Sequence, residues 1–131
     1  MGKPHYFIAV FGPLEEDKKT VESGVYKPNP KHPPTATAGD VLLLYCTSNY
    51  PDYYMEAPGL GIVLESAPDQ VDYRWLPFAQ PILRQSINAS LEPEAADRFG
   101  QLHFGSNWLI EISPESFSKI MSERTVAWGK L

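Results

Sequence analysis

The sequence predicts an α+β fold in which a mixed, mainly antiparallel sheet curls into a small β-barrel flanked by short helices. Strand-like apolar runs follow one another without the regular alternation with helices that is typical of parallel α/β folds. Thirteen prolines, roughly twice the average usage, favour turns and short elements over a helical bundle. The length of 131 residues and an apolar fraction of 43% indicate one soluble domain, residues 1–131, with a single core.

Apolar patterning predicts five strands. They cover His5–Phe11, Val41–Cys46, Gly59–Glu65, Tyr73–Leu83 and Trp108–Ile112. The run Val41–Cys46 is continuously apolar, which predicts a strand buried on both faces, with Gly59–Glu65 as its antiparallel neighbour. Pro77 interrupts the fourth run and indicates an edge strand or a bulge there.

Three short helices are expected between and after these strands. Acidic residues at the start favour a helix over Glu15–Ser23, and Pro93 in a first turn favours one over Glu92–Phe99. The last helix begins after Ser113-Pro114, an N-cap and first-turn pair. Its apolar face carries Phe117, Ile120 and Met121.

Charge and cysteine content limit the functions that the chain can have. A net charge of −5 and a pI near 5.1 argue against tight, non-specific binding to a phosphate backbone. The single cysteine, Cys46, offers no internal disulfide, and there is neither a signal peptide nor an apolar run near membrane-spanning length. We therefore expect a cytoplasmic protein that does not enter a membrane, in which the Asn88-Ala89-Ser90 glycosylation motif is a chance match.

Motifs for catalysis are weak, and we expect a non-catalytic protein without a cofactor or metal. His5, His32 and His103 are widely spaced, and no nucleophile elbow, phosphate loop or zinc-protease motif occurs. Cys46 follows leucines and has no adjacent cation, so a buried, inert thiol is expected. Two alternatives stay open: an enzyme acting on a nucleic acid or nucleotide, and a protein-interaction domain.

Five short motifs occur in an order that is known from one family. They are Phe11-Gly12-Pro13, Gly24-Val25, Gly39-Asp40-Val41, Gly59-Leu60-Gly61 and Ser106-Asn107. In this order and spacing, from about His5 to Met121, the chain resembles the EVE domain, a branch of the PUA-like superfamily that also contains the YTH and ASCH domains. The resemblance implies a small, distorted PUA-like barrel. It also implies a pocket that accepts a modified nucleobase, flipped out of DNA or presented by RNA.

The resemblance also implies which residues line that pocket. The ligand-binding set is Val10, Phe11, Gly12, Val25, Tyr26, Tyr45, Thr47, Asn49, Ser106 and Asn107. Flat side chains would sandwich the base, and fixed donors and acceptors would read its edge. The nucleic-acid backbone would meet Lys27, Lys31, Arg74 and Arg84. Asn107 stands where relatives carry a basic residue, so a free nucleoside or another small planar ligand is an alternative to a polynucleotide.

Several of these side chains also have ordinary structural explanations. Phe11 closes an apolar strand and is expected in the core, as are Trp75 and Trp108. Asp40 is expected to stabilise a turn. Tyr50, Tyr53 and Tyr54 form a tyrosine-rich loop that either covers the ligand or meets another protein.

Overall fold

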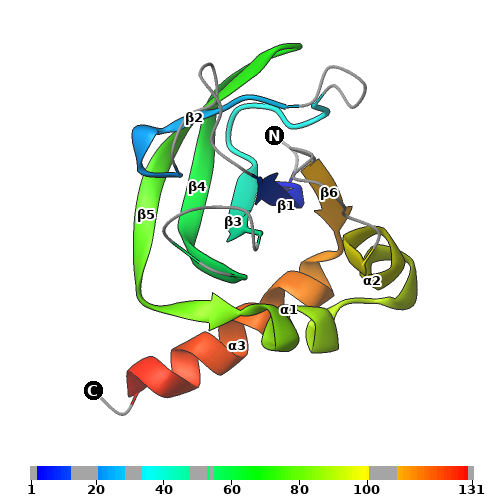
Figure 1. Cartoon of the computed structure of the whole chain (residues 1–131). Helices are drawn as coiled ribbons and strands as arrows, with labels where there is room; N and C mark the ends of the chain where they lie inside the picture. Colours follow the sequence, from blue (N-terminus) through cyan, green and yellow to red (C-terminus); the bar gives the residue numbers. More distant parts are fainter. Residues whose placement is uncertain are drawn as a thin grey trace.

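A computed structural model of the chain describes residues 3–12, 21–28, 34–47, 53, 55–100 and 109–129, with the backbone alone for residues 123–129. It is an α+β structure in which a curled sheet forms a half-barrel with helices packed at one side (Figure 1). The predicted class is therefore confirmed, together with a barrel-like curvature of the sheet.

The sheet has six strands in the order β2-β5-β4-β3-β1-β6. The strands are β1 (Tyr6–Phe11), β2 (Val25–Tyr26), β3 (Val41–Cys46), β4 (Glu56–Ala67), β5 (Gln70–Leu83) and β6 (Leu109–Ile112). Strands β1 and β3 are parallel, and every other neighbouring pair is antiparallel. The mixed, mainly antiparallel sheet that the sequence predicts is thus confirmed, including the pairing of β3 with β4.

The described residues form three α-helices: α1 (Arg84–Ser90), α2 (Pro93–Gly100) and α3 (Pro114–Gly129). The helices predicted around Pro93 and after Ser113 are confirmed, and the amide of Ser116 donates to the Ser113 hydroxyl as an N-cap (3.1 Å). Most of the predicted helix Glu15–Ser23 lies outside the described residues; its end, Val21–Ser23, is a 3-10 turn. The patterning missed α1 and the two-residue strand β2.

The two faces of the sheet support separate cores. Side chains alternate between faces along a strand, so neighbours in β1 and β3 belong to different cores. One face, here called the inner face, is the one covered by β2. It buries Phe7, Ala9, Phe11, Leu42, Leu44, Cys46, Val63, Val71 and Tyr73, together with Val21, Tyr26 and Ala36. The outer face buries Ile8, Val10, Leu43, Tyr45, Ala57 and Ile82 against the three helices. This double coverage explains why β3 is apolar at every position.

Among the described residues, strand β5 has no hydrogen-bonded neighbour along most of one edge. Its neighbour on that side, β2, pairs only with Val71 and Asp72, and the pairing with β4 shifts register between Ala57 and Gly59, opposite the stretch that begins at Pro77. The sequence predicts an edge strand or a bulge at Pro77, and in the structure Pro77 lies next to a register shift in a strand at this side of the sheet.

A buried carboxylate fixes the turn into β3. Asp40 accepts hydrogen bonds from the His5 amide (3.0 Å) and from the Thr37 amide (2.8 Å), which ties the start of β1 to the start of β3. The prediction that Asp40 stabilises a turn is confirmed.

Candidate ligand-binding site at the carboxyl ends of β1 and β3

Four strand ends meet at one end of the half-barrel. The parallel strands β1 and β3 finish side by side, with Phe11 opposite Cys46. Strand β4 begins at Glu56, also opposite Cys46, and β6 begins at Leu109, opposite Ala9. Connections that enter and leave a rigid sheet at one end are a common location for binding residues.

Hydrogen bonds and ring contacts join the predicted site residues at this end. The Tyr26 hydroxyl donates to the Val10 carbonyl (3.0 Å), and the Thr47 amide donates to the Phe11 carbonyl (3.0 Å). The Tyr26 ring meets the Phe11 ring edge-on, with centroids 4.9 Å apart. Three segments far apart in the sequence are thus held together at the carboxyl ends of β1 and β3.

The aromatic side chains of this set are deeply buried, and they divide between the two cores. Phe11 and Tyr26 lie in the inner core, whereas Val10 and Tyr45 lie in the outer core, where the Tyr45 ring contacts Phe99 (4.8 Å). Phe11 is therefore a core residue, as expected. Gly12 is buried, and Val25 and Thr47 are half-buried.

Tyr26 is held in its neutral form by its surroundings. Burial raises the pKa of the Tyr26 hydroxyl well above its ordinary value, because the phenolate would lose its hydration in the core. The neutral hydroxyl remains a donor to the Val10 carbonyl and keeps β2 attached to the end of β1.

Four predicted contact residues lie outside the described residues: Asn49, Ser106, Asn107 and Lys31. Thr47 and Leu109, which flank two of the three undescribed segments concerned, belong to this end of the sheet. The three described cations of the predicted backbone set are dispersed. Lys27 donates to the Gln70 side chain (2.6 Å), Arg84 lies over the Phe99 ring (5.1 Å), and Arg74 is exposed on β5.

Two half-buried rings that were not assigned to the site pack on the inner core. They are Tyr53, from the segment before β4, and Trp75, from β5. Trp75 lies on Gly59: a Cβ atom there would be 2.9 Å from the indole ring. The sequence signal for this contact is the Gly59-Leu60-Gly61 repeat, which the structure pairs with the alternating aromatics Tyr73 and Trp75 of β5.

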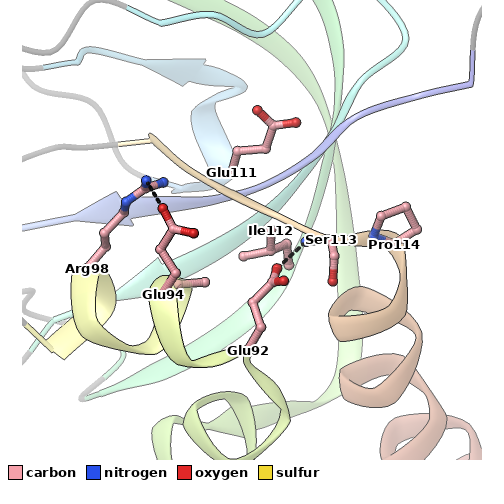
Figure 2. Close-up of a pocket in the computed structure, with 8 residues that line it drawn as sticks. Glu92, Glu94, Arg98, Glu111, Ile112, Ser113 and Pro114 are labelled. Carbon is pink, nitrogen blue, oxygen red and sulfur yellow. Dashed lines mark hydrogen bonds and ion pairs between the residues drawn. The ribbon is translucent and has the colours of Figure 1, made fainter.

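A separate pocket of about 290 Å³ lies between α2, β6 and the start of α3 (Figure 2). Its acidic side chains already have partners. Glu92 accepts from the Ser113 amide (3.1 Å), Glu94 pairs with Arg98 (2.8 Å), and Glu111 pairs with His5 (2.9 Å). The carboxylates therefore form a hydrogen bond at the start of α3, an ion pair with Arg98 and a surface hydrogen bond with His5. No group of three metal-ligating side chains occurs in the described part of the chain.

Two further pockets flank the segment before β3, at the opposite end of the sheet. One, of about 500 Å³, lies between residues 34–38 and the end of β4, and the other, of about 520 Å³, lies between residues 3–5 and 37–40. Neither is lined by a described residue of the predicted ligand-binding set.

No protein-family model matches the chain, and no curated protein matches it. The resemblance to the EVE domain thus stays a prediction. Within the described residues, no helix has the length and apolar character needed to cross a membrane.

Proposed function

We propose that the chain is a non-catalytic binding module of the PUA-like kind, which takes a modified nucleobase at the carboxyl ends of β1 and β3. The base is carried by DNA or RNA, or it is part of a free nucleoside. The observation that supports this proposal is the junction of Val10, Phe11, Tyr26 and Thr47 at one end of the sheet. The residues singled out by the resemblance come from four segments, and three of these segments contribute to this junction.

The chemistry of this end suits a planar, polar ligand. Stacking on a flat side chain stabilises a bound base by about 1–3 kcal/mol. Base edges are then recognised by fixed donors and acceptors. Thr47 is half-buried with a hydroxyl side chain, and Gly12 brings the backbone to the end of β1 without a side chain.

The framework supports the PUA-like interpretation because it holds the strand ends rigidly. The outer core fastens β1 and β3 to the three helices, and the inner core fastens them to β2 and β5. A binding site at these ends would be pre-organised, which reduces the entropic cost of binding.

Calorimetric titration tests the proposal. The probes are 6-methyladenosine and 5-methylcytidine with their unmodified counterparts, each as a nucleoside and within a short DNA and RNA oligonucleotide. We expect at least one modified probe to bind more tightly than its unmodified counterpart. Thr47→Val should weaken that binding, and Ser118→Ala, at an exposed position of α3, should leave it unchanged. Equal or absent binding of every modified and unmodified pair would overturn the proposal.

A further inference from the structure

We infer that Trp75 is the stacking surface for the ligand and that the ring it receives belongs to an uncharged molecule, such as a nucleoside, rather than to a phosphate-rich strand. This inference rests on the proposed function and specifies both a contact residue and the ligand class. Trp75 lies outside the set that the family resemblance assigns to the pocket.

The position of the indole follows from two glycines in β4. Gly59 and Gly61 lack the side chains that would otherwise fill the inner face beneath β5. At Gly59 a Cβ would be 2.9 Å from the Trp75 ring, and at Gly61 it would be 2.5 Å from the Tyr73 ring. Tyr73 is buried and its hydroxyl donates to the Val21 carbonyl, so its ring belongs to the core. The Trp75 ring packs on the same core but stays half-buried.

The strand register brings this ring toward the proposed binding end. Trp75 itself is opposite Gly61, but its ring lies over Gly59, which is nearer the start of β4. Gly59 of β4 pairs with Leu44 of β3, which in turn pairs with Ala9 of β1. In this row across three strands, two of the three residues on the inner face are therefore small. Trp75 thus covers a shallow part of the inner face, next to the row that contains Phe11 and Cys46.

Tyr53 packs on the same inner core from the segment before β4. The inner face therefore presents two half-buried aromatic side chains from different elements. Flat side chains that are supported by a core offer surfaces on which a planar ligand can stack.

The described cations do not accompany this aromatic pair. Arg74 precedes Trp75 in β5, and successive side chains of a strand point to opposite faces, so Arg74 lies on the outer side. Arg84 packs on Phe99 of the outer core, and Arg98 pairs with Glu94 on α2. Of the described lysines, Lys27 donates to the Gln70 side chain (2.6 Å), Lys3 lines the pocket before β3, and Lys119 belongs to α3. Among the described residues, the face that carries Trp75 thus has no arginine, whereas strand binding depends on neutralised phosphates.

Fluorescence of a protein with Trp75 as its sole tryptophan tests the contact. The chain has three tryptophans, so Trp108 and Trp128 are replaced with phenylalanine. Titration with 6-methyladenosine and 5-methylcytidine should quench Trp75 emission at the concentrations where calorimetry detects binding. Binding in calorimetry without any change in Trp75 emission would overturn the inference.

Affinity measurements then separate stacking from folding. Trp75→Leu should weaken nucleoside binding by about 5- to 150-fold, the range expected for one lost stacking contact, and Trp75→Phe should retain most of the affinity. Leu76→Ala is the matched control, because Leu76 is the next residue in β5, is 37% exposed and lies on the opposite face. Thermal melting identifies any variant that fails to fold.

A comparison of affinities for charged and uncharged probes tests the ligand class. The affinity for the nucleoside should equal or exceed that for its 5′-phosphate, and it should be nearly unchanged between 50 and about 200 mM salt, where phosphate-driven binding falls steeply. Tighter, salt-sensitive binding to the oligonucleotide would overturn the inference and leave the proposed function standing. If none of the probes binds the wild-type protein, the proposed function falls as well.

Discussion

Gly61 of β4 determines how closely Tyr73 of β5 can approach the inner face of the sheet. The Tyr73 ring occupies the space where a Cβ of residue 61 would be, at 2.5 Å from ring atom Cδ2. That ring cannot withdraw easily, because it is buried and its hydroxyl donates to the Val21 carbonyl. The glycine is therefore required by packing rather than by a backbone torsion.

Replacement of this glycine should consequently destabilise the fold. We expect Gly61→Ala to lower the free energy of unfolding by about 1–3 kcal/mol, the usual cost of overpacking a core. Urea denaturation measures the change. Glu65→Ala, at an exposed position of the same strand, should change the free energy of unfolding by less than about 0.5 kcal/mol. A Gly61→Ala protein as stable as Glu65→Ala would contradict this packing explanation.

The buried hydroxyl of Tyr26 makes stability depend on alkaline pH. Its folded-state pKa is raised by burial, so above about pH 10 the unfolded chain releases the proton while the folded protein retains it. Unfolding is thereby favoured, and the stabilisation by this group is lost as pH rises.

Tyr26→Phe tests both roles of this hydroxyl. At neutral pH the variant should lose about 1 kcal/mol, because the Val10 carbonyl loses its buried donor. Above about pH 10, its stability should decline less steeply than that of the wild type, by up to about 1.4 kcal/mol per pH unit. Urea denaturation at several pH values measures both effects. Identical alkaline slopes for the two proteins would contradict the buried, neutral assignment.

Among the elements, α3 depends on a local capping cluster. Ser113 caps the helix through the Ser116 amide (3.1 Å), and the Glu92 carboxylate accepts from the Ser113 amide (3.1 Å). The start of α3 is thus joined to the residue that precedes α2. The helix holds Phe117 and Ile120 against the outer core, so its cap contributes to the whole fold.

Loss of this cap should have a defined cost. We expect Ser113→Ala to reduce the free energy of unfolding by about 1 kcal/mol, as for other serine N-caps, and Ser113→Asp to retain most of it. Ser118→Ala changes the same residue type at an exposed position of α3 and should be nearly neutral. Equal losses in urea denaturation for Ser113→Ala and Ser118→Ala would show that the cap does not stabilise α3.

The elements that the sequence predicts are those with a strong local pattern. The apolar run Val41–Cys46 predicts strand β3, and the pair Ser113-Pro114 predicts the beginning of helix α3; both elements are present in the structure. Strand β2 has only two residues, and α1 (Arg84–Ser90) buries just Ile87 and Ser90, so neither produces a periodicity that sequence analysis can detect. The long run Tyr73–Leu83 is a strand despite two prolines because most of one edge needs no partner.

At the scale of the whole molecule, long-range strand pairing determines which side chains face each other, and sequence analysis cannot predict that pairing. The parallel alignment of β1 with β3 joins residues about 35 positions apart, and no local signal specifies it. That alignment determines that Phe11 and Tyr45 face different cores. A family pattern can assign both to one region, but only the register shows which face each side chain occupies.

The same register explains why Trp75 was predicted simply as a core residue. Alternation in β5 indicates an inward side chain, and the ring does pack on the inner core. The close approach of that ring to the sheet depends on Gly59, which comes from the neighbouring strand. Burial of a single side chain is thus a property of the assembled sheet.

The central claim concerns the location of ligand binding, and amide-resolved NMR tests it most directly. The uniformly nitrogen-15-labelled protein is titrated with the methylated nucleosides and their unmodified counterparts. The proposal predicts that the methylated probes shift the amides of Gly12, Tyr26 and Thr47 more than the unmodified probes do, with little change near Glu92 and Arg98. Shifts confined to the pocket of Figure 2, or no shifts at all, would contradict it.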